Sequence, residues 1–210
     1  TGTVENIKRA AGSGADAVLV VAPYYNKPTP KGLKRHFFTV AEHAEIPIVL
    51  YHIPGRCGVG IPMELVVELA QHPRIIGIKE AGGEVLRSGE LVRRTPDNFA
   101  VLSGDDALTL PLIAVGASGV ISVVSNLFPK TFARMVGSAL SGDFATALDF
   151  HQKLSPLLNA LARETNPGPI KEAMKLSGIE VGPVRPPLAP VLPRTRRAIR
   201  QALDGLGRME

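Results

Sequence analysis

Apolar and polar positions follow two alternating patterns along this chain. Short runs rich in β-branched residues occupy positions 17–22, 48–51, 75–79, 100–103 and 119–123. Segments with apolar residues at helical spacing separate these runs, at 32–44, 62–71, 85–94 and 107–115. The short runs recur about every 20–30 residues, which is the spacing of repeated βα units with parallel strands. The pattern therefore predicts an α/β fold built on a parallel sheet.

Residue types at the ends of the helical segments support this assignment. Pro62 suits a first helical turn, and Asp143 suits the N-cap of a longer helix. Pro169 suits the start of a further helix, which we expect Gly178 to end. After about Val123 the pattern is helical to the end of the chain. We expect this part to hold the closing helices of the fold and a small helical appendage.

Polar and reactive residues follow almost every predicted strand. An open doubly wound sheet places its site chiefly at one switch point, whereas a closed (β/α)8 barrel gathers all strand ends around one mouth. The sequence also lacks a glycine-rich phosphate loop after a strand. Both features favour a TIM barrel. The residues at the strand ends are Tyr24, Tyr25, Tyr51, Lys79, Ser103, Asp105, Asp106 and Ser122.

The predicted strands are fewer than a barrel needs. A complete barrel has eight strands and about 250 residues, whereas this chain has 210 residues and five predicted strands. It also begins without methionine, next to a predicted helix at 4–11. We therefore expect the sequence to lack roughly the first three βα units. The expected organisation is a partial barrel, strands 4 to 8, over residues 1–141 and a C-terminal helical region over residues 142–210.

Composition is ordinary for a globular protein, with 45% hydrophobic and 20% charged residues. No apolar run approaches the length of about 20 residues that spans a bilayer. The N-terminus lacks the basic and apolar segments of a signal peptide. The single cysteine, Cys57, cannot form an internal disulfide. We expect no membrane partner and a cytoplasmic location.

The formal net charge of +5 owes much to arginines near the C-terminus. Nucleic-acid binding is one interpretation, and the solvated face of a terminal helix is another. No aromatic residues lie between these arginines to stack on bases, so the helix face is favoured. We therefore expect no nucleic-acid partner. The arginines are Arg194, Arg196, Arg197, Arg200 and Arg208.

Lys79 ends the apolar run at 75–79. A lysine amine that is removed from water has a lowered pKa, and its neutral form is a nucleophile toward carbonyl carbons. By alternation Lys79 shares a strand face with Gly77 and Ile75, and Gly77 would leave room for a ligand. The alternative is a lysine whose head group reaches the water at the rim. We favour a Schiff-base lysine that acts on keto acids.

Two residues at or just after the end of the preceding apolar run, Tyr51 and Arg56, have side chains that could assist a Schiff-base lysine. Tyr51 ends the run at 48–51, where its phenol can relay protons or simply be a bonded core hydroxyl. Pro54 and Gly55 predict a turn that aims Arg56 at the barrel mouth, where an arginine can bind a carboxylate with two hydrogen bonds. A solvated surface arginine is the alternative.

Other candidates carry weaker signals. Asp105 and Asp106 are a possible divalent-metal pair, but supporting ligands at the other strand ends are absent, so we expect no metal site. Asp105 could instead orient a tyrosine or a backbone amide, and Asp106 could cap a helix. Cys57 beside Arg56 could have a lowered pKa, although no histidine base is evident. We expect His52 and Cys57 to be structural.

Six short segments together resemble the dihydrodipicolinate synthase family of class I pyruvate-lyase barrels. They occur in family order along essentially the whole chain, and their combination is highly specific. The segments are 23–28 (PYYNKP), 51–58 (YHIPGRCG), 77–81 (GIKEA), 102–106 (LSGDD), 119–123 (GVISV) and 166–171 (NPGPIK).

The resemblance implies a reaction and a site. Pyruvate would form a Schiff base with Lys79, Tyr51 would shuttle protons, and Arg56 would hold the carboxylate of aspartate semialdehyde. The product would be 4-hydroxy-tetrahydrodipicolinate, in lysine biosynthesis by the diaminopimelate pathway. No metal or organic cofactor would be needed. The backbone of Gly104 and Ile121 would line the site.

The resemblance also implies an assembly. Tyr25 would reach into the site of a neighbouring subunit and complete its proton relay. Tyr24 would lie near the interface at which lysine inhibits some family members. The expected assembly is a homo-oligomer, most simply a dimer of dimers.

The chain departs from the family pattern in two places. His52 replaces a common asparagine, with little expected effect. The Gly-Thr-Thr-Gly-Glu segment of an early strand, whose threonines bind the pyruvate carboxylate, is absent from these 210 residues. The resemblance therefore implies that this stretch alone is inactive.

Two alternative functions remain open. One is another pyruvate aldolase, such as N-acetylneuraminate lyase or a 2-keto-3-deoxy sugar-acid aldolase. The sialic-acid lyase branch lacks an arginine at the position of Arg56, which favours the synthase. The other is a non-catalytic binding member of the family, if the natural protein also lacks the early strand.

Overall fold

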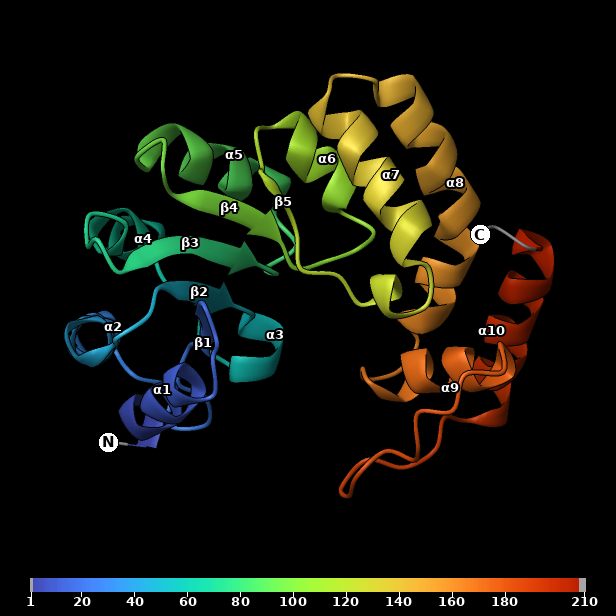
Figure 1. Cartoon of the computed structure of the whole chain (residues 1–210), viewed down its shortest axis with the longest axis horizontal. Coiled ribbons are helices and arrows are strands. Elements are labelled where there is room, and N and C mark those ends of the chain that lie inside the picture. The colour runs from blue at the N-terminus through green and yellow to red at the C-terminus, as the bar shows by residue number, and fades with distance from the viewer. Residues whose placement is uncertain (1, 208–210) are drawn as a thin grey trace. The chain divides into compact units, whose positions relative to one another are not determined.

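The computed structural model describes residues 2–207, and the chain forms two compact units that divide between Ile121 and Ser122 (Figure 1). The first unit contains a five-stranded parallel sheet in the order β1-β2-β3-β4-β5. Its strands are β1 (Val18–Val21), β2 (Ile48–His52), β3 (Ile75–Glu80), β4 (Ala100–Ser103) and β5 (Gly119–Val120). Its helices are α1 (Gly2–Gly12), α2 (Pro30–His43), α3 (Pro54–Cys57), α4 (Met63–Leu69), α5 (Val85–Arg94) and α6 (Thr109–Ala114).

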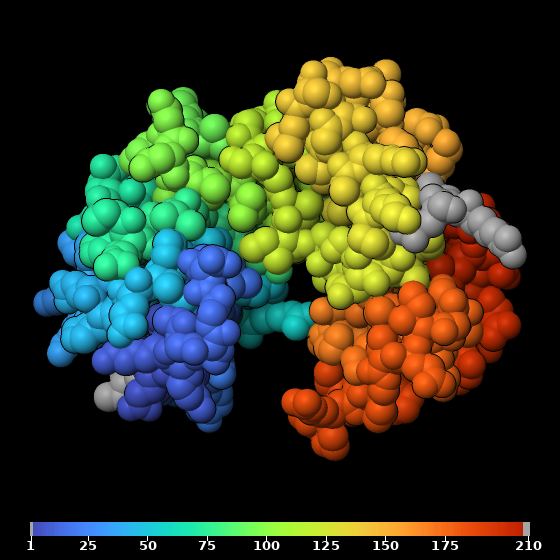
Figure 2. Space-filling view, in the orientation of Figure 1, coloured from blue at the N-terminus to red at the C-terminus, as the bar shows by residue number. Residues whose placement is uncertain are grey.

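The strand positions match the predicted apolar runs, so the parallel α/β sheet is confirmed. Helices α2, α4 and α5 lie along one side of this sheet (Figure 1). The first helix of the chain lies against α2, in dark and light blue in the space-filling view (Figure 2). Helical segments connect each strand from β1 to β4 to the start of the next strand, which keeps all five carboxyl ends at one edge.

One row of apolar side chains crosses the first four strands and fixes which face is buried. Val20, Leu50, Ile78 and Val101 occupy matching register positions, and all four are buried. They belong to one hydrophobic core with residues of the covering helices, including Phe37 of α2, Leu69 of α4 and Leu91 of α5. Since side chains alternate along a strand, the next residue of each strand lies on the opposite face.

The pairing of β2 with β3 contains an irregularity. Ile48 pairs with Ile75, but Val49 pairs with Gly77, so Ile76 is an extra residue in β3. The sequence predicts that Ile75, Gly77 and Lys79 share one face of the strand. This prediction is wrong for Ile75. Ile75 shares its face with Ile48 and the helix-side core, whereas Gly77 and Lys79 lie on the other face.

The described part of the second unit, residues 122–207, is helical, with a 3-10 turn η1 and four α-helices. These elements are η1 (Val124–Asn126), α7 (Pro129–Leu140), α8 (Phe144–Leu161), α9 (Gly168–Leu176) and α10 (Pro193–Leu206). The predicted N-cap at Asp143 is confirmed, because its carboxylate accepts a hydrogen bond of 3.0 Å from the backbone N–H of Thr146. Within this unit α7 packs on α8, and α10 packs on α8 and α9. The division between the two compact units lies between Ile121 and Ser122, before α7.

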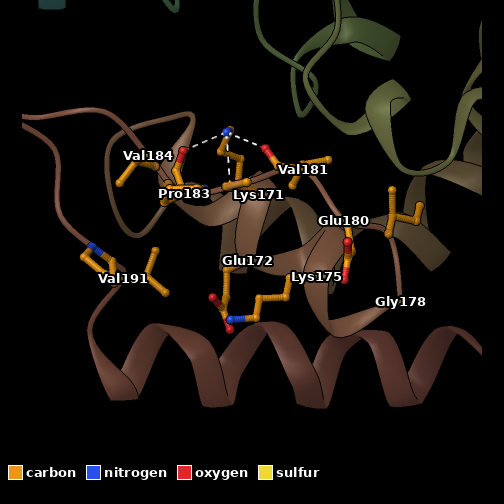
Figure 3. Close-up of a pocket in the computed structure, with 13 residues that line it drawn as sticks. Lys171, Glu172, Lys175, Gly178, Glu180, Val181, Pro183, Val184 and Val191 are labelled. Carbon is orange, nitrogen blue, oxygen red and sulfur yellow. Dashed lines mark hydrogen bonds between the residues drawn. The ribbon is translucent and has the colours of Figure 1, made fainter.

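The segment between α9 and α10 is held by one amine. Lys171 Nζ donates hydrogen bonds to the carbonyl oxygens of Val181, Gly182 and Pro183, at 2.8, 3.3 and 3.0 Å (Figure 3). A cavity of about 620 Å³ lies between α9 and this segment. The three donors of the Lys171 ammonium are all engaged with the protein. Lys171 is therefore a structural residue of this segment.

Candidate active site

Lys79 and Tyr51 form the centre of the site. They pair in register on β3 and β2, with Val21 and Leu102 at the matching positions of the flanking strands. Lys79 Nζ lies 4.5 Å from the centroid of the Tyr51 ring, and the lysine is 9% exposed. The lysine is thus buried among strand residues, and its amine faces an aromatic ring.

Burial lowers the pKa of the Lys79 amine, because the ammonium loses hydration. The negative charge of Asp106 raises this pKa in part, and the positive charge of Arg56 lowers it. The net direction is downward, which increases the fraction of neutral amine at a given pH. A neutral primary amine in a cleft can add to a ketone.

The phenol of Tyr51 has the opposite shift. Burial raises its pKa, the charge of Arg56 lowers it, and the buried thiol of Cys57 raises it. The net direction is upward, so Tyr51 keeps its proton in the absence of substrate. A protonated phenol beside a neutral amine can donate a proton to a leaving hydroxyl and take it back later.

Arg56 lies on a short helix, not on the simple turn that the sequence indicated. The helix α3 begins at Pro54 and is closed by Gly58, whose φ of 69° is left-handed and whose N–H bonds the Pro54 carbonyl at 2.8 Å. The Arg56 side chain is exposed, yet its charge affects the pKa of both Lys79 and Tyr51. A guanidinium at this position can bind a carboxylate that enters the site.

Gly104 makes space for the lysine. A Cβ atom at Gly104 would lie 2.7 Å from Ala81 Cβ and 3.0 Å from both Cγ and Cε of Lys79. The 2.7 Å approach to Ala81 is closer than real Cβ atoms come, and the 3.0 Å approaches would require the Lys79 side chain to shift. Gly77 has a different role from the expected one, because its Cβ would lie 2.6 Å from the Ala100 carbonyl oxygen. Gly77 therefore makes room for β4 and not for a ligand.

Ile121 follows β5 directly and is half-buried. Its N–H donates to the Ser103 carbonyl at 2.9 Å, and the N–H of Gly104 donates to the Glu80 carbonyl at 2.8 Å. Both amides extend the sheet hydrogen bonding beyond the strand ends. Any contact of Gly104 or Ile121 with a substrate would therefore use their other atoms.

The two tyrosines after β1 lie at the surface of the chain. Tyr25 is 88% exposed and Tyr24 is also exposed. Tyr25 has a φ of 69° and Lys27 a φ of 45°, both in the left-handed region that disfavours side chains. The structure brings Lys79, Tyr51, Gly104 and the charge of Arg56 together, whereas Tyr25 is not buried with them.

In the acidic pair Asp105 and Asp106 after β4, Asp105 accepts hydrogen bonds from residues close to it in the chain. Asp105 Oδ1 accepts the N–H of Ala107 at 2.9 Å, and the Asp105 carbonyl accepts the Ser103 hydroxyl at 2.7 Å. Within residues 2–207, no three His, Cys, Asp or Glu side chains are grouped to hold a metal ion. Cys57 is buried, which raises its pKa, so the lowered pKa considered from its neighbour Arg56 is wrong.

Sequence reasoning missed a buried polar cluster behind the site. His52 and Glu80 follow Tyr51 and Lys79 directly and pair in register, and Arg87 of α5 reaches Glu80. The available signal was the adjacency of two titratable residues to two site residues. It did not show that Arg87, seven positions further along the chain, would complete the cluster.

Comparisons with known proteins show the family of this chain. The model of the dihydrodipicolinate synthetase family matches residues 2–205. A relative from Methanococcoides burtonii named 4-hydroxy-tetrahydrodipicolinate synthase is 47% identical over 97% of this chain and 70% of its own length.

No helix within residues 2–207 is long and apolar enough to cross a membrane.

Two solved structures are also similar to this chain in sequence and in fold. Dihydrodipicolinate synthase from Acinetobacter baumannii, solved with pyruvate, is 40% identical with a TM-score of 0.92, over 97% of this chain and 70% of that chain. The enzyme from Cyanidioschyzon merolae, solved with lysine bound, is 38% identical with a TM-score of 0.93, over 97% and 69%. From its sequence and its structure, this chain belongs to the dihydrodipicolinate synthetase family.

Proposed function

We propose that this chain carries the Schiff-base lysine and the proton-shuttling tyrosine of a 4-hydroxy-tetrahydrodipicolinate synthase. The enzyme is a lyase of lysine biosynthesis that condenses pyruvate with L-aspartate 4-semialdehyde. The observation that carries the residue assignment is the buried residue Lys79, whose amine lies 4.5 Å from the centroid of the Tyr51 ring and has a lowered pKa. The five strands correspond in this proposal to strands 4 to 8 of a TIM barrel.

The first half of the reaction uses pyruvate alone. The neutral amine of Lys79 adds to the ketone carbon, and the C–N bond forms as the carbonyl oxygen takes a proton. Tyr51 donates a proton to the hydroxyl of this carbinolamine, which leaves as water and gives the protonated imine. Loss of a methyl proton then gives an enamine, whose electron pair is held at the former methyl carbon.

The second half joins the two substrates. The enamine carbon attacks the aldehyde carbon, and the aldehyde oxygen takes a proton to become the 4-hydroxyl group. The amino group of the former aspartate semialdehyde then attacks the imine carbon and displaces the Lys79 amine, which closes the ring. One water is released overall, in the imine step. Arg56 holds the carboxylate of the aldehyde substrate during the attack.

The aldehyde substrate distinguishes this proposal from the related aldolases. Arg56 supports the synthase, because its charge reaches both Tyr51 and Lys79 and matches a small carboxylate. A sugar-acid substrate would instead require donors and acceptors for several hydroxyl groups near the same entrance. Arg56 is the feature of this chain that favours aspartate semialdehyde.

The assembly is also part of the proposal. The exposure of Tyr25 and its left-handed backbone suit a side chain that is held out to enter the site of a second copy. Tyr24 then lies at the interface, where the lysine-bound relative suggests a feedback inhibitor. We propose a cytoplasmic homotetramer, built as a dimer of dimers, with Tyr25 completing the neighbour's proton relay.

Borohydride trapping tests this function. The protein expressed from its complete reading frame is incubated with pyruvate, reduced with borohydride, digested and analysed by mass spectrometry. The expected adduct is on Lys79 and is absent from the Lys79→Arg variant. Turnover with aspartate semialdehyde, in preference to sugar-acid aldehydes, supports the synthase. An unmodified Lys79 peptide would overturn the mechanism, and trapping without turnover would favour another aldolase or a binding member.

A further inference from the structure

A closed polar cluster lies behind the proposed active site, on the helix side of the sheet. His52 is 5% exposed and Glu80 is 2% exposed. They follow Tyr51 and Lys79 by one position each, so their side chains lie on the opposite face of the same two strands. Anything that fixes the ends of these strands also fixes the two site residues.

The cluster is held by hydrogen bonds from four different segments. Glu80 Oε1 accepts the N–H of Gly82 at 2.7 Å, and Oε2 accepts Arg87 Nε at 3.1 Å. A terminal nitrogen of Arg87 donates to the Ile61 carbonyl at 2.7 Å. The N–H of the same Ile61 donates to His52 Nδ1 at 3.0 Å. Ile61 therefore bonds the cluster through both of its backbone groups and joins β2 to α5.

The hydrogen bonds and the burial determine the tautomer of His52 and the charge partner of Glu80. Because Nδ1 of His52 accepts a hydrogen bond, the neutral ring carries its proton on Nε2, which lies 3.6 Å from Glu80 Oε1. Burial keeps the imidazole neutral, with a pKa lowered to about 4. Arg87 is the cation that faces the Glu80 carboxylate. Each member is thus matched to a partner, as buried polar groups require.

Two glycines leave no free space around the cluster. A Cβ at Gly60 would lie 2.9 Å from His52 Cε1. A Cβ at Gly82 would lie 2.7 Å from Glu80 Oε1 and 3.0 Å from His52 Nε2. The loops before α4 and after β3 therefore close directly onto the two side chains. Such close packing leaves the His52 and Glu80 side chains little room to move.

We propose that His52, Glu80 and Arg87 are positioning residues that hold Tyr51 and Lys79 in their reactive geometry. This inference rests on the proposed Schiff-base function. The cluster ties the last residues of β2 and β3 to Ile61 and to α5, so it limits sliding and twisting of the strand ends. Small misplacements of reacting groups are costly, since a shift of about 1 Å can lower a rate by roughly 100-fold.

The test compares Arg87→Met with Arg93→Met in the complete protein. Both changes remove one positive charge from α5, but Arg93 makes only an exposed pair with Glu90 in the described structure. We expect Arg87→Met to slow borohydride-trappable imine formation and to lower kcat by about 10–100-fold, with KM changed less than about threefold. Arg93→Met should match the wild type in both measurements.

A second pair of variants separates positioning from folding. His52→Asn keeps a side-chain acceptor for the Ile61 N–H, whereas His52→Leu removes it. We expect Asn to retain most of the imine-formation rate and Leu to lose it, measured on protein that circular dichroism shows to be folded. If folded Arg87→Met and His52→Leu form the imine at the wild-type rate, the cluster is only structural. If the wild type forms no imine, the proposed function itself fails.

Discussion

The amine of Lys79 lies 4.5 Å from the ring of Tyr51 because the two residues pair in register on adjacent parallel strands. This relationship places the proposed nucleophile and the proposed proton donor side by side, without any loop to position them. Sites on strands are held more rigidly than sites on loops. The chemistry of the chain therefore depends on the alignment of β2 with β3.

Tyr51→Phe should lower kcat by roughly 100-fold or more, because the ring remains but the proton donor is lost. KM for pyruvate should change little, since no pyruvate-binding contact is assigned to the hydroxyl. Steady-state kinetics at saturating pyruvate measure both quantities. Activity within threefold of the wild type would show that another group moves the proton.

The rate of imine formation should rise with pH as the Lys79 ammonium loses its proton, with a midpoint below the usual lysine value of 10.5. Arg56 lowers the pKa of Lys79 and Asp106 raises it. Arg56→Met should therefore move the midpoint to higher pH, and Asp106→Asn should move it to lower pH. Rapid-mixing measurements with pyruvate alone avoid the proposed role of Arg56 in binding the second substrate. Shifts in the same direction for both variants would contradict this electrostatic account.

Gly104→Ala should reduce kcat by about 10–100-fold, because its Cβ would meet the side chain of Lys79. Gly137→Ala is the matched control, since a Cβ at Gly137 in helix α7 has no neighbour within 4 Å. The control should keep full activity and gain about 0.5–1 kcal/mol of stability from the better helix propensity of alanine. Equal activity of both variants would remove the proposed role of Gly104.

Acid should destabilise the protein through His52. Its pKa is about 4 when folded, below the ordinary 6.5, so the unfolded chain binds the proton more tightly between these values. The free energy of unfolding should fall as pH drops from 6.5 to 4, with a contribution on the order of 2 kcal/mol.

Urea titrations of the wild type and of His52→Asn over this pH range isolate the His52 contribution. Glu80 titrates in both proteins, and burial raises its pKa, so its own contribution has the opposite sign. The variant should therefore lose less stability on acidification than the wild type. Parallel curves for the two proteins would contradict the assignment of a neutral buried imidazole.

Lys171→Met should destabilise the second unit by about 1–3 kcal/mol, because three carbonyls lose their hydrogen-bond donor. Lys175→Met, one turn further along α9 and exposed, should have a much smaller effect. Hydrogen exchange should show faster exchange in residues 179–192 for the first variant only. Unchanged exchange there would mean that other contacts hold the segment.

The sequence predicted the strands and the central lysine because both depend on local patterns. The end of an apolar run at Lys79 and the alternation in β2 are properties of a few consecutive residues. The extra residue Ile76 could not be predicted, since a bulge changes the pairing with a neighbour and not the composition of the strand. The sequence predicts a turn where the short helix α3 lies, because four residues are too few to show helical periodicity.

The surroundings of the site depend on contacts between distant segments. The role of Gly104 follows from the path of the Lys79 side chain, and the cluster of Glu80 depends on Arg87 and on the backbone of Ile61. The hydrophobic periodicity of a segment contains no information about such contacts between distant segments. The family resemblance supplied the roles of Arg56 and Tyr25, which the residues alone left open.

Each strand from β2 to β5 pairs with the strand that precedes it in the chain. A growing polypeptide can therefore dock each new βα unit onto one that has already left the ribosome. Contacts between neighbouring units span a few tens of residues, which favours rapid assembly over slow searches for distant partners. The alignment of Tyr51 with Lys79 can form as soon as β3 emerges, before the helices of the second unit have been synthesised.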